Sequence, residues 1–336
     1  MKISCSHCKK EFTVSEDQIY DYNIEIILSC PECNKDMEID LNTLQLAVST
    51  YDQNHLYGEN LKKAILKSVK RIPPMPQVAI KARKIISNPD SNFSELAEMI
   101  ESDQGIASQV LRIANSAYYG VTKKVSSVQR ASAILGTKTI LEILTIACSS
   151  TLLGNKLNGY GLSTGDLWMH SLLTAYGSNI IAKKSRPELA EDAFTAGLIH
   201  DSGKLILDPY ILERNKTFTK RLNGEDISFL DAEKDVLGFD HAEIASEVCL
   251  KWQIPDNISK AIRYHHYPAQ SPEKDLTYIV HLADAISMMS GMGLGYDGMH
   301  YQADERALEL LGILATDINI IMCEVVESVK NVVDIY

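Results

Sequence analysis

The sequence lacks an excess of positive charge. It has 33 Lys and Arg residues against 44 Asp and Glu residues, which gives a formal net charge of −11. Proteins that bind nucleic acid through its phosphates present a basic face, and no run of Lys and Arg indicates one here. The charge therefore argues against nucleic acid as a partner.

Long hydrophobic runs are missing as well. No segment approaches the roughly 18 consecutive apolar residues that a membrane-spanning helix needs. The first residues, MKISCSHCKKEF, lack the apolar core of a secretory signal peptide, so we expect a cytoplasmic protein. The composition, 45% hydrophobic and 23% charged over 336 residues, is typical of a folded protein with one large core or two modest ones.

Cysteine is scarce, but four of the seven cysteines form two C-x-x-C pairs. These are Cys5, Cys8, Cys30 and Cys33. The spacing predicts two knuckles whose four sulfurs bind one zinc ion in a reducing compartment. Strands are expected at residues 24–28 and 38–41, which makes residues 1–45 a zinc ribbon. Because so short a segment buries little apolar surface, metal would supply most of its folding free energy.

The charge of the ribbon also bears on its role. Residues 1–55 carry four lysines against ten carboxylates, so a structural or protein-binding ribbon fits better than one that binds nucleic acid. His7 lies inside the first knuckle and could replace a cysteine as ligand, although four sulfurs suffice. Residues 46–59 are predicted to be a linker, because a polar stretch lies within them.

Residues 60–150 predict short amphipathic helices without competing strand alternation. Asp103 is expected to open one helix, Ser126 or Ser127 the next, and Thr137 a third after Gly136. Short helices around a glycine turn are also typical of helix-turn-helix DNA binding. The exposed positions lack the Arg and Asn density of a recognition helix, so a packed helical subdomain is favoured.

Four segments of this region resemble the HDOD domain, the HD-related output domain of bacterial signalling proteins. The segments are Ile72–Pro76, Ser94–Asp103, Leu111–Gly120 and Ala131–Gly136. The resemblance covers roughly residues 60–290 and excludes the ribbon. It implies an all-α body, with an N-terminal helical subdomain over 60–150 and an HD-like subdomain over 151–290. Residues 291–336 are expected to form helices that pack on this body.

Histidine and aspartate recur in a fixed order within the HD-like half. The order is His170, His200 with Asp201, His241, His265 with His266, and Asp284. Such side chains, when they converge inside a helical bundle, can hold one or two metal ions. Adjacent residues on a helix are about 100° apart, so the His-Asp pair can share an ion only near a helix end or at the edge of a helix. The alternative is that these histidines are structural side chains that are buried and hydrogen-bonded.

By resemblance to active HD-superfamily phosphohydrolases, His170, His200, Asp201 and Asp284 would bind a first metal. His241, His265 and His266 would bind a second one. Imidazole and carboxylate ligands suit Fe, Mn, Ni or Zn, and paired metals can activate water against a phosphodiester. The same resemblance places Lys204 as a candidate phosphate-contacting cation.

The sequence departs from the branch that degrades cyclic di-GMP. That branch has a Gly-Tyr-Pro element after its histidine doublet, whereas Tyr-Pro-Ala-Gln follows here, so this hydrolysis is not expected. HDOD domains also resemble degenerate HD relatives without known hydrolysis. We therefore expect a cytoplasmic regulatory scaffold that binds protein partners, with room for a small-molecule ligand. The alternative is a metal-dependent phosphohydrolase acting on a nucleotide or phosphodiester.

Overall fold

The computed structural model describes residues 2–4, 8, 10–13, 26–29, 32–33, 36–39, 57–68, 82, 85, 93–222, 227–296 and 303–333. The chain divides into two compact units, Met1–Leu61 and Lys62–Tyr336. Helix α2 (Gly58–Ser68) includes the point of division. The proline-rich run before Gln77 predicts a helix that begins near this residue, and that position lies outside the described residues.

The smaller unit contains two antiparallel strand pairs. Strand β1 (Lys2–Ser4) pairs with β2 (Glu11–Thr13), and β3 (Ile26–Ser29) pairs with β4 (Asp36–Ile39). In the second pair, Ile26 lies opposite Ile39. The strands β3 and β4 overlap the two predicted segments, each displaced by about two residues. Four short strands alone do not define a zinc ribbon, which therefore stays a prediction.

The larger unit begins with helices α4 (Phe93–Glu101), α5 (Gln104–Ala114), η4 (Ala117–Tyr119), α6 (Val128–Leu135) and α7 (Thr137–Leu153). Two predicted caps are present: Asp103 Oδ1 accepts from Ile106 N at 3.1 Å, and Ser127 Oγ accepts from Arg130 N at 3.2 Å. The prediction that Thr137 caps α7 was wrong. Gly136, with φ of 83°, occupies the cap position, because the sharp turn between α6 and α7 needs a left-handed backbone.

Asn115 fastens the loop that follows α5. Its Nδ2 donates to Leu111 O at 2.8 Å and to Val125 O at 3.0 Å, while its Oδ1 accepts from Val125 N at 2.7 Å. Val125 is buried, so its backbone groups need protein partners. The Asn115 side chain thus satisfies both the backbone N–H and the backbone C=O of Val125, ten positions away, and holds the loop against the helix.

The two tyrosines of η4 join this helical group to the rest of the unit. Tyr119 donates its hydroxyl to Glu142 Oε1 on α7 at 3.2 Å. The ring of Tyr118 meets Tyr176 on α8 (Asp166–Ser185) edge to face, with centroids 5.1 Å apart. Burial raises the pKa of Glu142 to about 7, although Lys183 and Tyr119 oppose that change.

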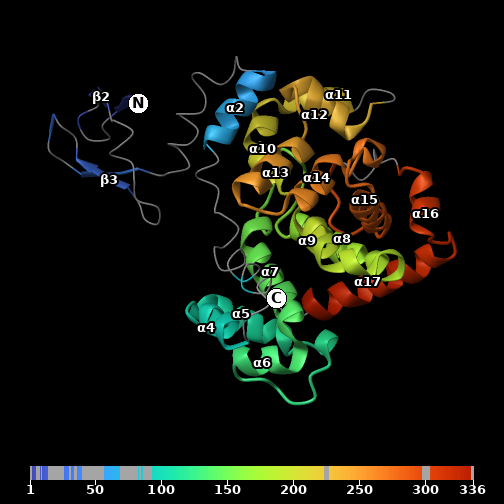
Figure 1. The fold of residues 1–336 in the computed structure, drawn as a ribbon. Coiled ribbons are helices and arrows are strands. Elements are labelled where there is room, and N and C mark those ends of the chain that lie inside the picture. The colour runs from blue at the N-terminus through green and yellow to red at the C-terminus, as the bar shows by residue number, and fades with distance from the viewer. Residues whose placement is uncertain are drawn as a thin grey trace. The chain divides into compact units, whose positions relative to one another are not determined.

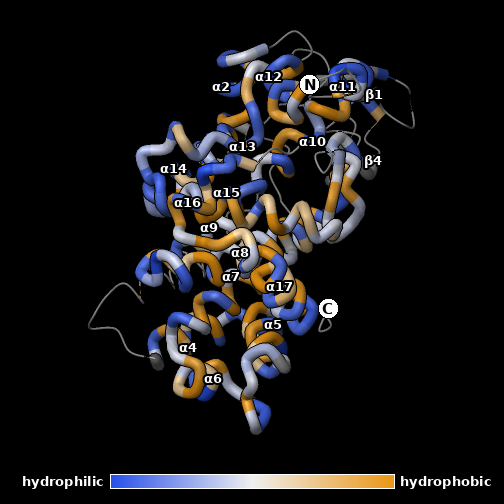
Figure 2. Tube along the Cα trace, turned by 90° about the vertical axis from the view of Figure 1, so that its right-hand side faces the viewer, coloured by the Kyte–Doolittle hydropathy of each residue, from blue (hydrophilic) through white to orange (hydrophobic). Residues whose placement is uncertain are grey.

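Further helical segments make up the described part of the HD-like half. They are α8, η5 (Pro187–Leu189), α9 (Ala190–Ile199), α10 (Gly203–Glu213), α11 (Asn215–Leu222), α12 (Phe229–Leu237), α13 (His241–Lys251), α14 (Asp256–Tyr264) and α15 (Lys274–Met289), and a short turn η6 (Pro268–Gln270) precedes the last. Helix α8 lies at the centre, packed on both α9 and α15 (Figure 1). Figure 2 shows hydrophobic residues concentrated along these central helices. Because α8 is buried almost all round, its sequence shows no strong polar face.

Helices α16 (Arg306–Leu311) and α17 (Asp317–Val333) complete the described part of the chain. Helix α17 packs on α8 and η4. Gly177 permits the close packing around α8, because a Cβ there would lie 3.2 Å from Ala283 Cβ. Among the described residues, no helix is long and apolar enough to cross a membrane.

Candidate metal centre

The structure brings all seven predicted histidine and aspartate ligands to one place. They come from five different helices or helix ends of the larger unit. His170 lies on α8, His200 and Asp201 follow α9, His241 opens α13, His265 and His266 follow α14, and Asp284 lies on α15. The sequence Asp240-His-Ala-Glu243 predicts a helix that Asp240 caps, and the structure confirms it, since Asp240 Oδ1 accepts from Glu243 N at 2.8 Å.

Glycines on either side of the His-Asp pair permit the convergence. A Cβ on Gly197 would lie 2.7 Å from both Thr174 O and Ser178 Oγ, so α9 packs directly on the α8 backbone. A Cβ on Gly203 would lie only 2.0 Å from His241 O. Side chains at these positions would push the helices apart. His200 and Asp201 occupy the turn between α9 and α10, which allows both to face the same interior point.

One half of the cluster surrounds His170. Its Nε2 lies 3.3 Å from His200 Nε2 and 3.1 Å from Asp284 Oδ1. His200 Nε2 lies 3.7 Å from the same Asp284 oxygen and 3.5 Å from Asp201 Oδ1. These four side chains are the first predicted set, and the structure places them together.

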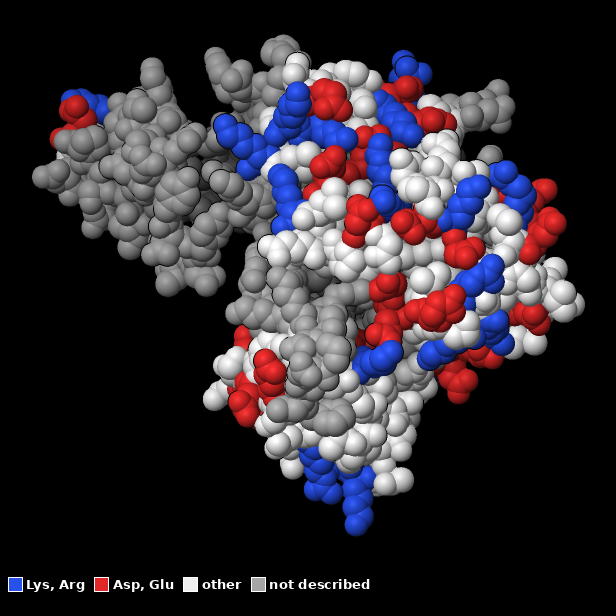
Figure 3. Space-filling model, viewed as in Figure 1, with Lys and Arg blue, Asp and Glu red and all other residues white. Residues whose placement is uncertain are grey.

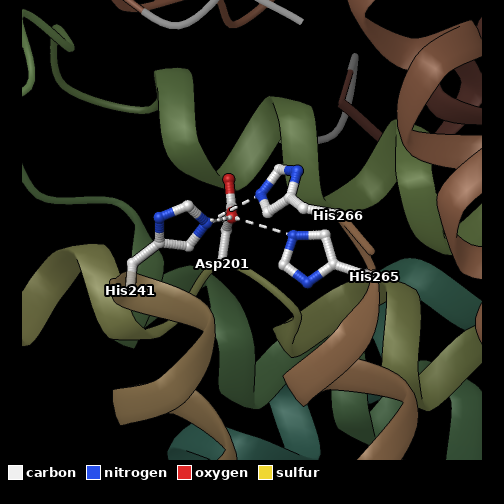
Figure 4. A group of neighbouring side chains, drawn as sticks. All are labelled: Asp201, His241, His265 and His266. Carbon is white, nitrogen blue, oxygen red and sulfur yellow. Dashed lines mark hydrogen bonds and ion pairs between the residues drawn. The ribbon is translucent and has the colours of Figure 1, made fainter. Parts of the chain in front are cut away.

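The other half of the cluster surrounds Asp201, as Figure 4 shows. Its Oδ1 lies 3.1 Å from His241 Nε2 and 3.9 Å from His265 Nε2. The His241 and His266 Nε2 atoms are 3.0 Å apart. Ligand atoms of Asp201, His241, His265 and His266 all lie within 4.8 Å of one another, which is close enough to share an ion. Asp201 thus belongs to both halves, whereas the sequence assigned it only to the first.

Hydrogen bonds fix the orientation of the imidazole rings. His200 Nδ1 donates to Gly197 O at 2.8 Å, and His265 Nδ1 donates to Ile262 O at 2.7 Å. In both residues this leaves Nε2 to face the cluster as a potential ligand. Metal-binding histidines commonly have such an outer partner, which sets the tautomer and the ring plane.

Glu233 is a residue of the site that the sequence did not indicate. Its Oε2 accepts from both His241 Nδ1 at 2.8 Å and His241 N at 2.9 Å, and its Oε1 accepts from Tyr160 OH at 2.7 Å. Glu233 is fully buried on α12. A lone glutamate in an amphipathic helix carries no motif, and only the fold places it behind His241.

His281 also lies outside the cluster proper. The spacing of three residues between His281 and Asp284 predicts one helical face for both, yet His281 Nδ1 donates to His265 O at 2.7 Å and its Nε2 accepts from Asp304 N at 2.7 Å. Both ring nitrogens are therefore occupied. His281 links the backbone of a candidate ligand to the segment that precedes α16.

The electrostatics of the two halves differ. Burial opposes protonation of His241, but the carboxylates of Glu233 and Asp201 raise its pKa to about 10. Burial and the neighbouring His200 lower the pKa of His265 to about 3. Burial opposes ionisation of Asp284, but the His170 hydrogen bond and the charge of neighbouring histidines lower its pKa. The site therefore holds ionised carboxylates, a neutral imidazole at His265 and a proton on His241, and a metal that binds His241 Nε2 would have to displace that proton.

Several buried polar atoms have no hydrogen-bond partner among the described residues. They include Asp201 Oδ1, His265 Nε2 and both carboxylate oxygens of Asp284. Buried polar atoms are normally satisfied, and unsatisfied ones cost free energy. Asp201 Oδ1 lies at ion-pair distance from His241 and His265, and Asp284 Oδ1 lies at ion-pair distance from His170, so the residues fit a divalent cation.

Comparisons with known proteins agree with this architecture. A sequence profile of the HDOD domain matches residues 72–268. The chain is 24% identical over 243 residues to an uncharacterized protein of Treponema pallidum (strain Nichols), with 71% of this chain and 43% of that protein covered. The chain thus spans less than half the length of that relative.

Three solved structures share the fold. An HDOD domain protein of unknown function from Geobacter sulfurreducens has a TM-score of 0.65 at 22% identity, covering 81% of this chain and 97% of that one. A proposed phosphohydrolase from Shewanella amazonensis SB2B has a TM-score of 0.61 at 23% identity, with 80% of this chain and 98% of that one covered. A proposed signal transduction protein from Marinobacter aquaeolei VT8 has a TM-score of 0.65 at 23% identity, with 88% of this chain and 64% of that one covered. The chain belongs to the HDOD domain family.

Proposed function

We propose that this protein is a regulatory scaffold of bacterial signalling, in which the buried histidine and aspartate cluster holds a divalent metal ion. The solved structure from Marinobacter, a proposed signal transduction protein, supports the first part of this proposal. The metal site is supported by carboxylate oxygens without hydrogen-bond partners among the described residues. It is also supported by imidazoles whose Nδ1 atoms donate to backbone carbonyls outside the cluster. Bound metal would stabilise the arrangement of the helices that supply its ligands, because side chains from several helices would share it.

Burial of the ligands is the observation that favours a scaffold over an enzyme. His170, His200, Asp201, His241, His265 and Asp284 are each between 0% and 2% exposed. Only His266 is half-buried. A catalytic metal needs an open coordination position and access for substrate, whereas a structural or regulatory metal is served well by a closed site.

The second candidate is a metal-dependent phosphohydrolase acting on a nucleotide or phosphodiester. The shared position of Asp201 favours it, because a carboxylate that contacts two ligand groups is suited to a pair of metals. A bound metal would supply Lewis-acid activation of water. The chain itself would orient the ligands through Glu233 and Gly197. The Shewanella neighbour is a proposed phosphohydrolase, but the missing Gly-Tyr-Pro element argues against cyclic di-GMP as substrate.

Metal analysis of the full chain tests the metal site. Replacing His200 and Asp201 together by Ala should abolish metal binding in the helical unit while the ribbon keeps its zinc. Unchanged metal content in the double variant would remove this assignment. Hydrolysis assays on nucleotides and phosphodiesters, with Mn, Fe, Ni or Zn supplied, separate the two functions. Turnover that is lost in the double variant would establish the enzyme instead of the scaffold.

We also propose that Cys5, Cys8, Cys30 and Cys33 bind one zinc ion. Cys5 and Cys30 lie outside the described residues. Near the other two, Lys10 Nζ lies 2.7 Å from Glu32 Oε2. This exposed ion pair joins a residue two positions after Cys8 to the residue before Cys33. The acidic surroundings favour a protein partner for this module rather than nucleic acid.

The surface of the larger unit is consistent with protein partners in the cytoplasm. On the face shown in Figure 3, acidic and basic side chains are interspersed, with no continuous basic area. Binding to nucleic acid would require such an area and would fall steeply with salt. A small-molecule ligand of the cluster would have to enter beside His266, the one half-buried member.

A further inference from the structure

Lys204 is the only cationic side chain among the described residues that is buried within the cluster. It lies in the first turn of α10 and is 2% exposed. Its Nζ lies 2.6 Å from Asp201 Oδ2, and the same ammonium lies 5.6 Å from the centre of the Phe229 ring. Both side chains of this ion pair are shielded from solvent, unlike a lysine that binds phosphate at the protein surface.

The two oxygens of Asp201 have different neighbours, since Oδ1 contacts imidazoles of both halves, including His200 Nε2 at 3.5 Å, whereas Oδ2 binds Lys204. Oδ1 lies 3.1 Å from His241 Nε2 and 3.9 Å from His265 Nε2. Oδ2, which Lys204 binds, is the oxygen that lies 3.7 Å from His170 Nε2. Lys204 therefore occupies the carboxylate oxygen that faces His170, and it leaves Oδ1, which lies nearest His241, available.

The charge of the cluster agrees with this geometry. When the histidines are neutral, as metal ligands must be, Asp201, Asp284 and Glu233 contribute three negative charges and Lys204 contributes one positive charge, with all four side chains buried. The net charge of −2 is neutralised by one divalent ion, whereas two would leave a buried charge of +2. Burying uncompensated charge is strongly unfavourable. The cluster has enough ligand atoms for two divalent ions, but enough negative charge to neutralise only one.

We propose that Lys204 is a built-in counter-ion that restricts the cluster to one tightly bound divalent ion. This ion binds between Asp201, His241, His265 and His266, and the ammonium of Lys204 weakens binding of a second ion beside His170, His200 and Asp284. The inference rests on the proposed metal site and adds its stoichiometry and its order of filling. Lys204 acts here through Asp201 and is a positioning residue.

The test is a titration of the metal-stripped full chain with Mn²⁺, followed by calorimetry and by electron paramagnetic resonance, in which paired Mn²⁺ ions give a spin-coupled signal. Wild type should bind one ion tightly in the helical unit and a second weakly. Lys204→Gln keeps a hydrogen-bond donor but removes the charge. It should bind the second ion at least roughly tenfold more tightly, because a unit charge a few ångströms away has at least that effect inside a protein.

Two controls make the outcome specific. Lys260→Gln removes a lysine that pairs with Asp256 at 2.6 Å on the surface, and it should leave both binding steps unchanged. Second, with Lys204 retained, His266→Ala should abolish the tight step and His170→Ala should preserve it. This second comparison still decides the order of filling if Lys204→Gln does not fold.

Different results would overturn the metal site and the role of Lys204. Wild type that binds no metal in the helical unit would overturn both the metal site and the role of Lys204. One or two ions bound by wild type with no change in Lys204→Gln would overturn the counter-ion alone. Loss of the tight step in His170→Ala would likewise reject the order of filling, while the metal site itself would stand.

Discussion

The contact between Gly203 and the backbone of His241 predicts a large effect from a single methyl group. Gly203 has ordinary helical geometry, so Ala would impose no dihedral strain, and the whole effect would come from the space available. The new Cβ would lie 2.0 Å from His241 O and 3.1 Å from Ala245 N. Since both atoms belong to the α13 backbone, no side-chain rotation can relieve the clash, and α10 must move away from α13.

The magnitude follows from two opposed effects. Overpacking costs about 1–3 kcal/mol and occasionally more, and this site is at the severe end because backbone meets backbone. Ala in a helix recovers about 0.5–1 kcal/mol relative to Gly. We expect Gly203→Ala to lower the free energy of unfolding by about 2 kcal/mol and to weaken metal binding, because His241 and Asp201 would separate.

The assay is urea unfolding of the full chain without metal, followed by a metal titration of the folded variant. Gly105→Ala is the matched control, because Gly105 lies in the first turn of α5, where a Cβ would have only Asp103 Oδ1 nearby, at 3.3 Å. That variant should be as stable as wild type or slightly more stable. If Gly203→Ala unfolds at the same urea concentration as wild type, the argument from close helix packing is refuted.

Three further predictions concern other parts of the chain. Asn115→Ala should lower the free energy of unfolding by about 2–3 kcal/mol, because it removes three hydrogen bonds and leaves the buried Val125 backbone unsatisfied. Urea unfolding measures this change, and a loss below about 0.5 kcal/mol would count against the role of Asn115 in fastening the loop. The contribution of Glu142 to stability should fall as pH rises from about 4.5 to about 7, because its pKa is raised to about 7 in the folded protein, and this carboxyl group therefore binds more protons in the folded state than in the unfolded state in that interval. Tyr118, Tyr119, Tyr176 and Lys183 surround that carboxyl group, and Glu142→Gln should remove roughly 1–3 kcal/mol of this pH dependence; an identical pH profile for the variant would contradict it. Cys33→Ser should reduce zinc in the full chain by about one equivalent and leave metal in the helical unit in place, whereas unchanged zinc would contradict the ribbon.

Local signals in the sequence predicted the parts of the fold that depend on local chemistry. Asp103 and Asp240 begin helices because a short acceptor side chain precedes an apolar repeat, and no distant contact is needed for that inference. Thr137 failed for the same reason: it is a good cap by composition, but the turn from α6 required the left-handed backbone of Gly136. A single residue type can satisfy a local rule while the connection between helices decides otherwise.

The candidate site divides along similar lines. The order of the histidines and aspartates, together with the family resemblance, indicated the seven clustered side chains. It could not indicate that Asp201 is shared between two halves, that Glu233 anchors His241, or that Lys204 binds Asp201 rather than solvent. Each of these depends on which helices pack together, and the distances are set by α10 against α13 and by α12 behind it.

The position of α15 has a practical consequence for anyone who expresses part of this protein. The HDOD profile ends at residue 268, yet Asp284 and His281 lie beyond it, and His281 in turn holds the His265 carbonyl. A truncation at the profile boundary would discard one carboxylate and expose the apolar face of α8 that α15 covers. The smallest useful recombinant fragment must therefore extend through α15 and include Asp304, whose backbone amide secures His281.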